Sequence, residues 1–501
     1  MWVPLLKGLI CVMSVLAVHT ASADNYRLPL RRCTTDSANS WPLVPTRSGT
    51  STPLVGDVRV PIILTAYKDV AFTVDDVRQV WDDMANKHGY SDHGAQGCMA
   101  DYFYEQSRGK FRITFDVIGP VTLPQNRFFY GERSDIRVNQ MVKDACSLAA
   151  GLPDVDFSDY DWNGDGIVET VLVVYAGVGE NVSGAPSESV WPKQGYVGGS
   201  INDSIRLSIY ACANELVWPD FRQEGFGTLT HEFSHCFGLL DLYNTASFID
   251  DYIIFDEWDL MDGGCYSADG WGPVGYSAYE RMLCGWLEPE ELKDVTDIDQ
   301  LEALHDNGKA YKLCSDSTNE YLLLENRQHQ SFDTYLPGHG LLVTHVGAYG
   351  SNPNYGINVA VYPIPADGLS YPLSFRKYVQ DYYGVTLPDD SLNMTDKYSK
   401  YQYDEYGRSR LMAGTAFPYM EGETVVSDAL SMFSKTVSNI RERDGQISFH
   451  FTNGPDAMTS LATAHRHPVA YYDLQGRQLA GLQKGICIVR YQDGSAKKVI
   501  R

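Results

Sequence analysis

Runs of apolar, β-branched residues alternate with a stretch of helical spacing over the first half of the chain. Residues 58–67, with the sequence VRVPIILTAY, give the first strong strand signal, and the segments FRITFDVIG and VETVLVVYAGV predict further strands. Between them, FTVDDVRQVWDDMANKHGY repeats its apolar residues at helical intervals. This predicts an amphipathic helix with one buried face formed by Val74, Val77, Val80, Trp81 and Met84. We therefore expect an α+β fold over residues 57–290.

The second half of the chain carries mainly strand signals. The segments EYLLLEN, GLLVTHV and GQISFHF predict a β-rich second domain over residues 291–453. A polar, tyrosine-rich stretch near 388–410 interrupts it, and we expect a surface insertion there. Residues 468–501 place short apolar runs around turns, which predicts a small β tail.

The first residues have the composition of an export signal. Lys7 precedes an apolar run from Gly8 to Val18, and small residues follow it, so residues 1–23 are expected to be a secretory signal peptide. Residues 24–56 are rich in Ser, Thr, Pro and Arg and show little periodicity, which favours a leader or prosegment. We expect a secreted protein without a later membrane span.

Composition narrows the classes of function. The 501 residues are 44% hydrophobic, enough for real cores, and carry a formal net charge of −24. Such a charge repels phosphates, so nucleic acid is not an expected partner. The chain has ten cysteines but no CxxC pair, which argues against a zinc site made of thiolates.

The segment THEFSHCFGLLDLYN, which begins at Thr230, concentrates metal-binding groups. If residues 228–240 form a helix, the apolar residues share one side and His231 and His235 share the opposite side, one turn apart. Two imidazoles at this spacing can bind one ion, with Glu232 beside them as a candidate general base. The simpler interpretation is that both are ordinary surface or core histidines.

The residues after this helix offer a third ligand. Gly238 can adopt the left-handed conformation that ends a helix, and Asp241 then lies where its carboxylate could reach the same ion. Two histidines and one carboxylate leave the fourth zinc position open to water, whose pKa zinc lowers. Asn244 and Glu257 remain rivals of Asp241 as third ligand.

Further downstream, WDLMDGG places Met261 before two glycines that would allow a tight turn. The pattern HExxHxxGxxD followed by such a methionine turn resembles the metzincin-like peptidases, and specifically the immune inhibitor A family of secreted bacterial zinc proteases. Other segments resemble the same family in the same order, including DYFYEQSRGKF, ANELV, SAYERMLCGWL, LPGHGLLVTHV and VSNIRERDGQISFHF.

The resemblance implies a function for each group. His231 and His235 would bind zinc, Glu232 would be the general base, and Met261 would form the floor under the metal. The tyrosine that some metzincins carry two residues after the methionine is absent, since Gly263 stands there. Tyr266 and Tyr276 are the alternatives for stabilising an oxyanion.

A second cation site is predicted upstream. The segment DWNGDGIVE spaces oxygen ligands at alternate positions, and Gly166 permits a sharp bend between them, as calcium loops require. The expected calcium ligands are Asp161, Asn163, Asp165, Glu169 and the carbonyl of Ile167. A solvated acidic turn is the competing interpretation.

The two ends of the chain suggest transport and latency. Residues 468–501 resemble the small β-sandwich tails that sort enzymes across the outer membrane of some gram-negative bacteria, which implies contact with a secretion machinery and a possible cell-surface location. The Cys33 thiolate could occupy the open zinc position and keep a zymogen silent, although a disulfide or a free thiol is the commoner role.

The sequence thus predicts a secreted zinc endopeptidase acting on extracellular proteins or peptides, with Zn²⁺ and Ca²⁺ as cofactors. The alternative from another class is a catalytically silent surface protein that binds host or matrix protein on a protease scaffold. A zinc hydrolase that cleaves another bond is a third option, because one site can serve several chemistries.

Overall fold

The computed structural model describes these residues: 34–35, 54–181, 185–217, 220–246, 254–347, 349, 352–355, 358–366, 403–418, 430–453, 468–472, 478–479, 486–491 and 496–500. The predicted signal peptide, most of the predicted leader including Cys33, and residues 388–402 of the predicted insertion lie outside them. The domain boundaries predicted from the sequence stay predictions.

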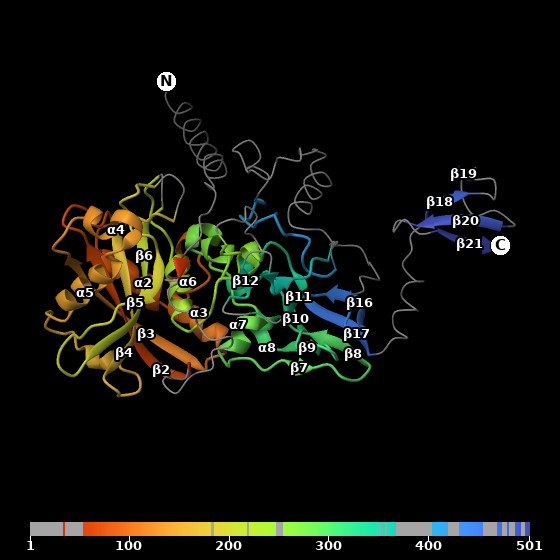
Figure 1. Cartoon of the computed structure of the whole chain (residues 1–501), viewed down its shortest axis with the longest axis horizontal. Coiled ribbons are helices and arrows are strands. Elements are labelled where there is room, and N and C mark those ends of the chain that lie inside the picture. Colours follow the sequence, from red (N-terminus) through yellow and green to blue (C-terminus); the bar gives the residue numbers. More distant parts are fainter. Residues whose placement is uncertain are drawn as a thin grey trace, which may run out of the picture.

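A six-stranded sheet forms the centre of the N-terminal half (Figure 1), with the order β1-β5-β6-β4-β2-β3. Its strands are β1 Thr34–Thr35, β2 Gly56–Ala66, β3 Phe111–Thr122, β4 Ile167–Val178, β5 Lys193–Tyr196 and β6 Arg206–Leu216. Strands β3, β2, β4 and β6 run parallel, whereas β5 is antiparallel to β6. Strand β1 pairs with β5 in parallel, so it occupies the edge beyond the antiparallel strand.

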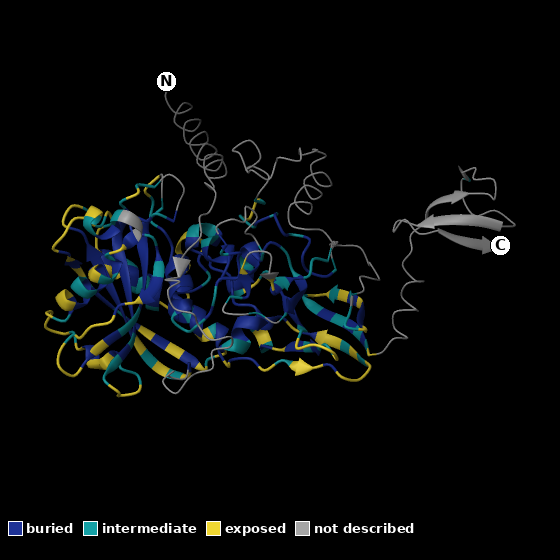
Figure 2. Ribbon diagram, in the orientation of Figure 1, coloured by how far each residue is buried: buried dark blue, intermediate teal, exposed yellow. Residues whose placement is uncertain are grey.

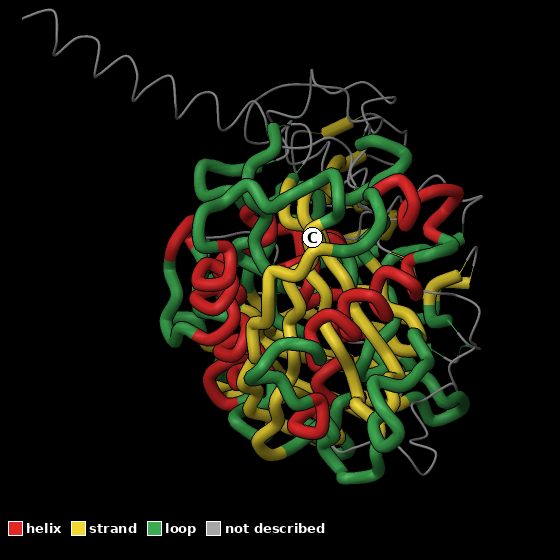
Figure 3. The backbone as a smooth tube through the Cα atoms, turned by 90° about the vertical axis from the view of Figure 1, so that its left-hand side faces the viewer, coloured by secondary structure: helices red, strands yellow, loops and turns green. Residues whose placement is uncertain are grey.

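Helices cover both faces of this sheet (Figure 3). The α-helices are α2 Val77–Asn86, α3 Met99–Gln106, α4 Arg127–Asp135, α5 Val138–Ala149, α6 Gly227–His235, α7 Ala278–Leu283 and α8 Leu304–Asn307. The 3-10 turns are η1 Asp92–Gly94, η2 Phe157–Tyr160, η3 Asp256–Trp258, η4 Gly263–Gly270 and η5 Ser331–Tyr335. The predicted combination of helices and sheets is confirmed.

Alternation along the strands explains why both faces are covered. Successive strand residues point to opposite faces, so Leu172 and Val174 pack with α2, α3 and α6, while Val171 and Val173 pack with α5. Strands buried on both faces are continuously apolar, which is the pattern from which they were predicted. Figure 2 shows the central strands as a buried layer.

The C-terminal half is built from further sheets. A five-stranded sheet has the order β14-β11-β10-β9-β7, and a four-stranded antiparallel sheet has the order β15-β16-β17-β8. The strands are β7 Glu290–Glu291, β8 Thr296–Leu301, β9 Ala310–Cys314, β10 Tyr321–Arg327, β11 Gly340–Val346, β14 Val361–Pro363, β15 Leu430–Met432, β16 Lys435–Arg443 and β17 Gln446–Asn453. We refer to the described residues from 287 to 453 as the C-terminal unit.

Two smaller sheets complete the described part of the chain. Strands β12 Asn354–Tyr355 and β13 Asn358–Val359 form an antiparallel pair. The tail forms an antiparallel sheet of β18 Pro468–Tyr472, β19 Gln478–Leu479, β20 Ile486–Tyr491 and β21 Ala496–Ile500. Its role in sorting stays a prediction.

One apolar cluster runs through both halves. Phe233, Trp258 and Met261 belong to the same buried cluster as Leu323 of β10 and Leu342 of β11. The two halves therefore share a core instead of touching at a polar surface. Among the described residues, none of the helices combines the length and apolarity needed to span a bilayer.

Candidate metal centre

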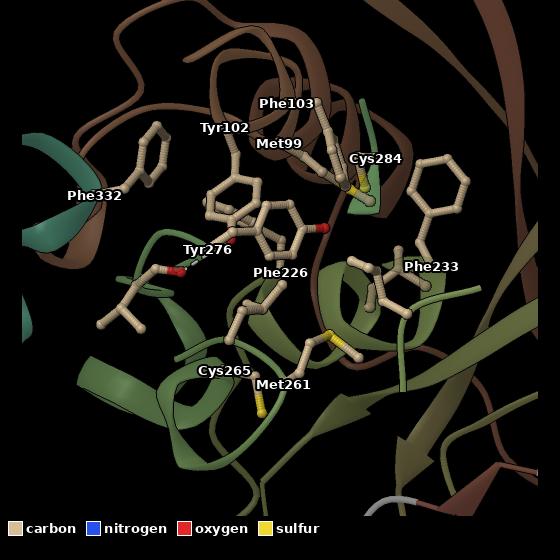
Figure 4. Close-up of a cluster of buried hydrophobic side chains, with 14 of the residues drawn as sticks. Met99, Tyr102, Phe103, Phe226, Phe233, Met261, Cys265, Tyr276, Cys284 and Phe332 are labelled. Carbon is tan, nitrogen blue, oxygen red and sulfur yellow. Dashed lines mark hydrogen bonds between the residues drawn. The ribbon is translucent and has the colours of Figure 1, made fainter. Parts of the chain in front are cut away.

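Helix α6 carries the HExxH residues and packs against β6. Its first residue, Gly227, lies so close to η4 that a Cβ there would meet the Cys265 carbonyl oxygen at 2.0 Å. Leu229 and Phe233 enter the apolar core, where Phe233 makes edge contacts with Phe103 of α3 (Figure 4). Packing on two sides thus fixes how the helix is rotated, and with it the direction of the histidines.

The helix is shorter than the sequence predicts. The expected helix 228–240 ends at His235, and the prediction of its C-terminal third is wrong. The amides of Cys236, Phe237 and Gly238 each bond the carbonyl three residues earlier, and Gly238 has a φ of +87° in the left-handed region. This tight turn reverses the chain, so that Asp241 lies beside the helix it has just left.

Three side chains converge there. The Nε2 atoms of His231 and His235 are 3.2 Å apart, and the Oδ1 atom of Asp241 lies 3.4 Å from the first and 3.2 Å from the second. Four ligands at bonds of about 2.0–2.1 Å in a tetrahedron would be about 3.3 Å apart. The three atoms therefore match the corners of one tetrahedral site, and the group could hold a metal ion.

The hydrogen bonds of the histidines support the same conclusion. His231 Nδ1 lies 2.8 Å from the Leu260 carbonyl oxygen, and His235 Nδ1 lies 2.8 Å from the Leu239 carbonyl oxygen. Because a carbonyl only accepts, both Nδ1 atoms carry the proton and the Nε2 lone pairs face each other. Two lone pairs and a carboxylate at this distance repel one another unless a cation lies between them, so the donor set fits a divalent metal.

Electrostatics keep Asp241 ionised despite its burial. Burial alone would raise the pKa of this carboxyl, but when His235 and His231 are protonated on Nε2 as well, their charge and hydrogen bonds outweigh the burial and lower the pKa to about 2. An ionised carboxylate is the form that binds a metal.

The rival third ligands are engaged elsewhere. Asn244 Oδ1 accepts a hydrogen bond from the Ala246 amide, and Glu257 accepts hydrogen bonds from Ser267 and Tyr403. Glu257 does not belong to the converging group. Of the three residues that the sequence leaves open, Asp241 lies within 3.4 Å of both histidines.

The whole site is enclosed. The sequence places the histidines opposite the apolar face of α6, but in the structure both sides of the helix are covered, with His231 1% and His235 2% exposed. Glu232 follows His231 on the helix and is also buried. The ligand side chains themselves therefore have almost no contact with solvent.

The methionine turn connects the site to the rest of the fold. The carbonyl of Leu260 accepts from His231, and the carbonyl of Met261 accepts from the Leu242 amide, next to Asp241. Asp259 Oδ1 in turn accepts from the Met261 amide. Met261 itself is buried in the apolar cluster (Figure 4). Sequence reasoning missed these supports because backbone carbonyls have no sequence signal.

Tyr276 is not placed to stabilise an oxyanion. Its ring is completely buried in the apolar cluster and its hydroxyl pairs with Ser234 of α6 (Figure 4 shows the ring). Burial raises the pKa of Tyr276 far above its usual value. Tyr266 stays a prediction.

A second cluster of side chains that could bind a metal, made of His88, Cys98 and Asp101, is explained by helix capping. Cys98 caps α3, its Sγ accepting from the Asp101 amide, while Asp101 Oδ2 accepts from the Cys98 and Gly89 amides. His88 bonds Asp101 Oδ1 from the surface. Every one of these contacts is a capping or surface contact, and no metal is needed to explain them.

The predicted calcium loop is closed by its own backbone. The Asp161 carboxylate accepts from the amides of Gly164, Asp165 and Gly166, and Asp165 Oδ1 accepts from the Ile167 amide. Asn163 Oδ1 accepts from the Asp165 amide and Glu169 Oε2 from the Trp162 amide. These residues are not among the described groups that could hold a metal, so calcium stays a prediction without structural support.

Known proteins are similar to the part of the chain that forms this site. Residues 64–284, which include α6, Asp241 and the methionine turn, match the family model described as the immune inhibitor A peptidase M6 catalytic domain. The pre-pro-metalloprotease PrtV of Vibrio cholerae serotype O1 is 21% identical over 257 residues, which are 43% of this chain and 27% of PrtV. Immune inhibitor A of Bacillus thuringiensis subsp. alesti is 25% identical over 214 residues, 36% of this chain and 30% of that protein.

The match covers less than one third of either relative. The family-model match, residues 64–284, includes the helix, the turn and the loop that bring the three candidate ligands together. Residues 64–284 of this chain are therefore similar to the catalytic domain of the immune inhibitor A peptidases, family M6.

Proposed function

We propose that the protein is a zinc-dependent endopeptidase that hydrolyses peptide bonds of extracellular proteins. The observation that carries the proposal is the spacing of the two Nε2 atoms and Asp241 Oδ1, 3.2 to 3.4 Å, which suits a tetrahedral cation with one position left for a reactant. The match of residues 64–284 to a peptidase family model supports peptide bonds as the bonds that are cleaved.

Each residue has a proposed role. His231, His235 and Asp241 hold Zn²⁺, which supplies Lewis acidity for the scissile carbonyl when bound. The Glu232 carboxylate takes a proton from the attacking water and returns it to the leaving amine. Gly238 makes the turn that delivers Asp241, and Met261 shapes the floor of the site.

The sheet supports a metzincin-like arrangement. Strand β5 is the antiparallel member of the sheet and contacts α6, so an extended peptide that took the place of β1 on its outer side would lie near the candidate ligands. A sheet edge binds extended peptides through main-chain hydrogen bonds.

We further propose that residues 24–56 keep the enzyme latent. Thr34–Thr35 pairs with β5 at Lys193 and Gln194, the edge that a substrate would need. The relative PrtV is named a pre-pro-metalloprotease. Removal of the leader should therefore expose the edge and raise the rate of cleavage.

Location is proposed from the sequence. The pattern of residues 1–23 and the name of PrtV support export. The antiparallel tail sheet is proposed to contact a secretion machinery.

The test compares the protein without residues 1–56, its Glu232→Ala variant and its His235→Ala variant. We expect the parent to bind one zinc ion and digest an unstructured protein, Glu232→Ala to bind zinc without digesting, and His235→Ala to lose both. Zinc binding without digestion by the parent would favour the silent binding protein, and absence of zinc from the parent would refute the metal site.

A further inference from the structure

We propose that the C-terminal unit completes the metal centre, with Asn354 as a positioning residue for Asp241. The inference rests on the proposed zinc site. It concerns residues outside the segment 64–284 that matches the peptidase family, and it assigns to the C-terminal unit a part in binding the metal.

The loop that carries Asp241 is held from the C-terminal unit. Asn354 of β12 is completely buried, and its Nδ2 donates to the Leu242 carbonyl oxygen at 2.8 Å and to the Val361 carbonyl oxygen at 2.8 Å. Its Oδ1 accepts from the Ala360 and Val361 amides. One amide group therefore ties the residue next to Asp241 to the backbone of β14.

Two further contacts hold the same loop. The Thr245 amide donates to the Asn354 carbonyl oxygen at 3.3 Å, and Asn352 Nδ2 donates to Thr245 Oγ1 at 2.8 Å. The loop thus has hydrogen bonds to the C-terminal unit at both Leu242 and Thr245. The amide of Leu242 bonds the Met261 carbonyl on the other side, so this peptide is held by both halves of the molecule.

The methionine turn is held in a similar way. Arg327 of β10, also fully buried, donates to the Gly275 carbonyl oxygen at 2.9 Å and to the Trp258 carbonyl oxygen at 3.4 Å. These carbonyls lie on either side of the turn that supports His231 through Leu260. Asp333 and Glu325 in turn accept from the Gly275 and Ala278 amides.

The physical consequence concerns the spacing of the ligands. A carboxylate binds a cation strongly only when it is already held at the right distance from the other ligands, and groups that orient ligands typically change metal affinity by about 10- to 100-fold. Without Asn354, the buried Leu242 carbonyl would lose its donor and the loop would lose its tie to β14. Asp241 would then have to be ordered at the time the metal binds.

A matched control is present in the same unit. Asn326 is also a fully buried asparagine, and its Nδ2 donates to two carbonyls, those of Leu301 and Gly445, both within the C-terminal unit. Replacing it removes the same kind of hydrogen bonds without touching the Asp241 loop.

The experiment measures zinc affinity of the leader-free protein by competition with a chelator, together with urea unfolding of the metal-free protein. We expect Asn354→Leu to bind zinc about 10- to 100-fold more weakly than the parent. Asn326→Leu should lower stability but leave the affinity at the parent level. Thr245→Val, which removes one hydroxyl from the same loop, should weaken binding in the same direction and by less.

Equal affinity of Asn354→Leu and the parent would overturn the inference, as would an equal loss in Asn326→Leu. If Asn354→Leu does not fold, Thr245→Val decides, and an unchanged affinity there overturns the inference. A parent that binds no zinc refutes the proposed function itself and the inference with it, which separates the two failures.

Discussion

Asp241 is the residue on which the identity of the metal site depends most directly. Asp241→Asn keeps the size of the side chain but loses the ionised oxygen that faces both histidines. We expect zinc affinity to fall by more than the 10- to 100-fold that orienting groups cost. Glu257→Gln is the control, because Glu257 bonds Ser267 and Tyr403 instead. A larger loss of zinc in the Glu257 variant would show that the third ligand is misassigned.

Glu224 gives a prediction about pH. The usual pKa of a glutamate side chain is 4.5. Burial raises the pKa of Glu224 to about 7, and the hydrogen bonds from Thr228 and Asn214 partly oppose this rise. Glu224 therefore binds its proton more tightly in the folded protein than in the unfolded protein. Its contribution to the free energy of unfolding is complete below pH 4.5 and is lost as the pH rises through 7.

The measurement is the free energy of unfolding of the parent and of Glu224→Gln at several pH values from 4.5 to 8. We expect the parent to lose, relative to the variant, on the order of 3 kcal/mol over this range. Parallel pH profiles for the two proteins would contradict the assignment.

The sequence could predict the two histidines but not the whole site. His231 and His235 are one helical turn apart, so their convergence follows from helix geometry alone. Asp241 lies beyond a turn at Gly238, where no periodicity applies, and Asn244 and Glu257 stayed open for that reason. Asn354 was out of reach, since it meets Leu242 across 112 residues of sequence.

At the scale of elements, strand β10 carries a buried ionic cluster into the interface between the halves. Arg327 donates to Asp333 through two nitrogens at 2.7 Å and to Glu325 at 3.1 Å, all without exposure to solvent. Arg327→Leu removes the closest positive charge from two buried carboxylates. We expect a loss of about 3–5 kcal/mol in the free energy of unfolding, measured with urea.

The comparison variant for that experiment is Arg112→Leu. Arg112 pairs with Asp57 on the surface, where the two side chains are 49% and 77% exposed. Solvent screens such a pair, so its removal should lower the free energy of unfolding far less than the removal of Arg327. Similar losses in both variants would mean that the buried cluster does not stabilise the interface.

Elements with an uninterrupted pattern were predictable and those ended by a local turn were not. The apolar stretch 58–67 became β2, Gly56–Ala66, because burial on both faces requires continuous apolar residues. Helix α6 was predicted too long because Cys236, Phe237 and Leu240 continue the apolar spacing. The three-residue hydrogen bonds around Gly238 end the helix in spite of that pattern.

At the scale of the molecule, the shared core predicts cooperative unfolding. Residues of both halves belong to one apolar cluster, and Asn354 and Arg327 bond the first half from the second. We expect residues 54–453 to unfold in one calorimetric transition and a fragment of residues 54–290 to lack a cooperative transition. Two separate transitions, or a folded fragment, would show that the halves are independent.

The near-complete enclosure of the two histidines also bears on how the ion enters. An ion held between side chains that are 1% and 2% exposed is expected to exchange slowly with the surrounding solution and faster when the polypeptide opens locally. Loading is then easiest while the chain is still maturing, before the halves close on each other. The time at which the metal is supplied, and not only its concentration, would decide how much of the protein contains it.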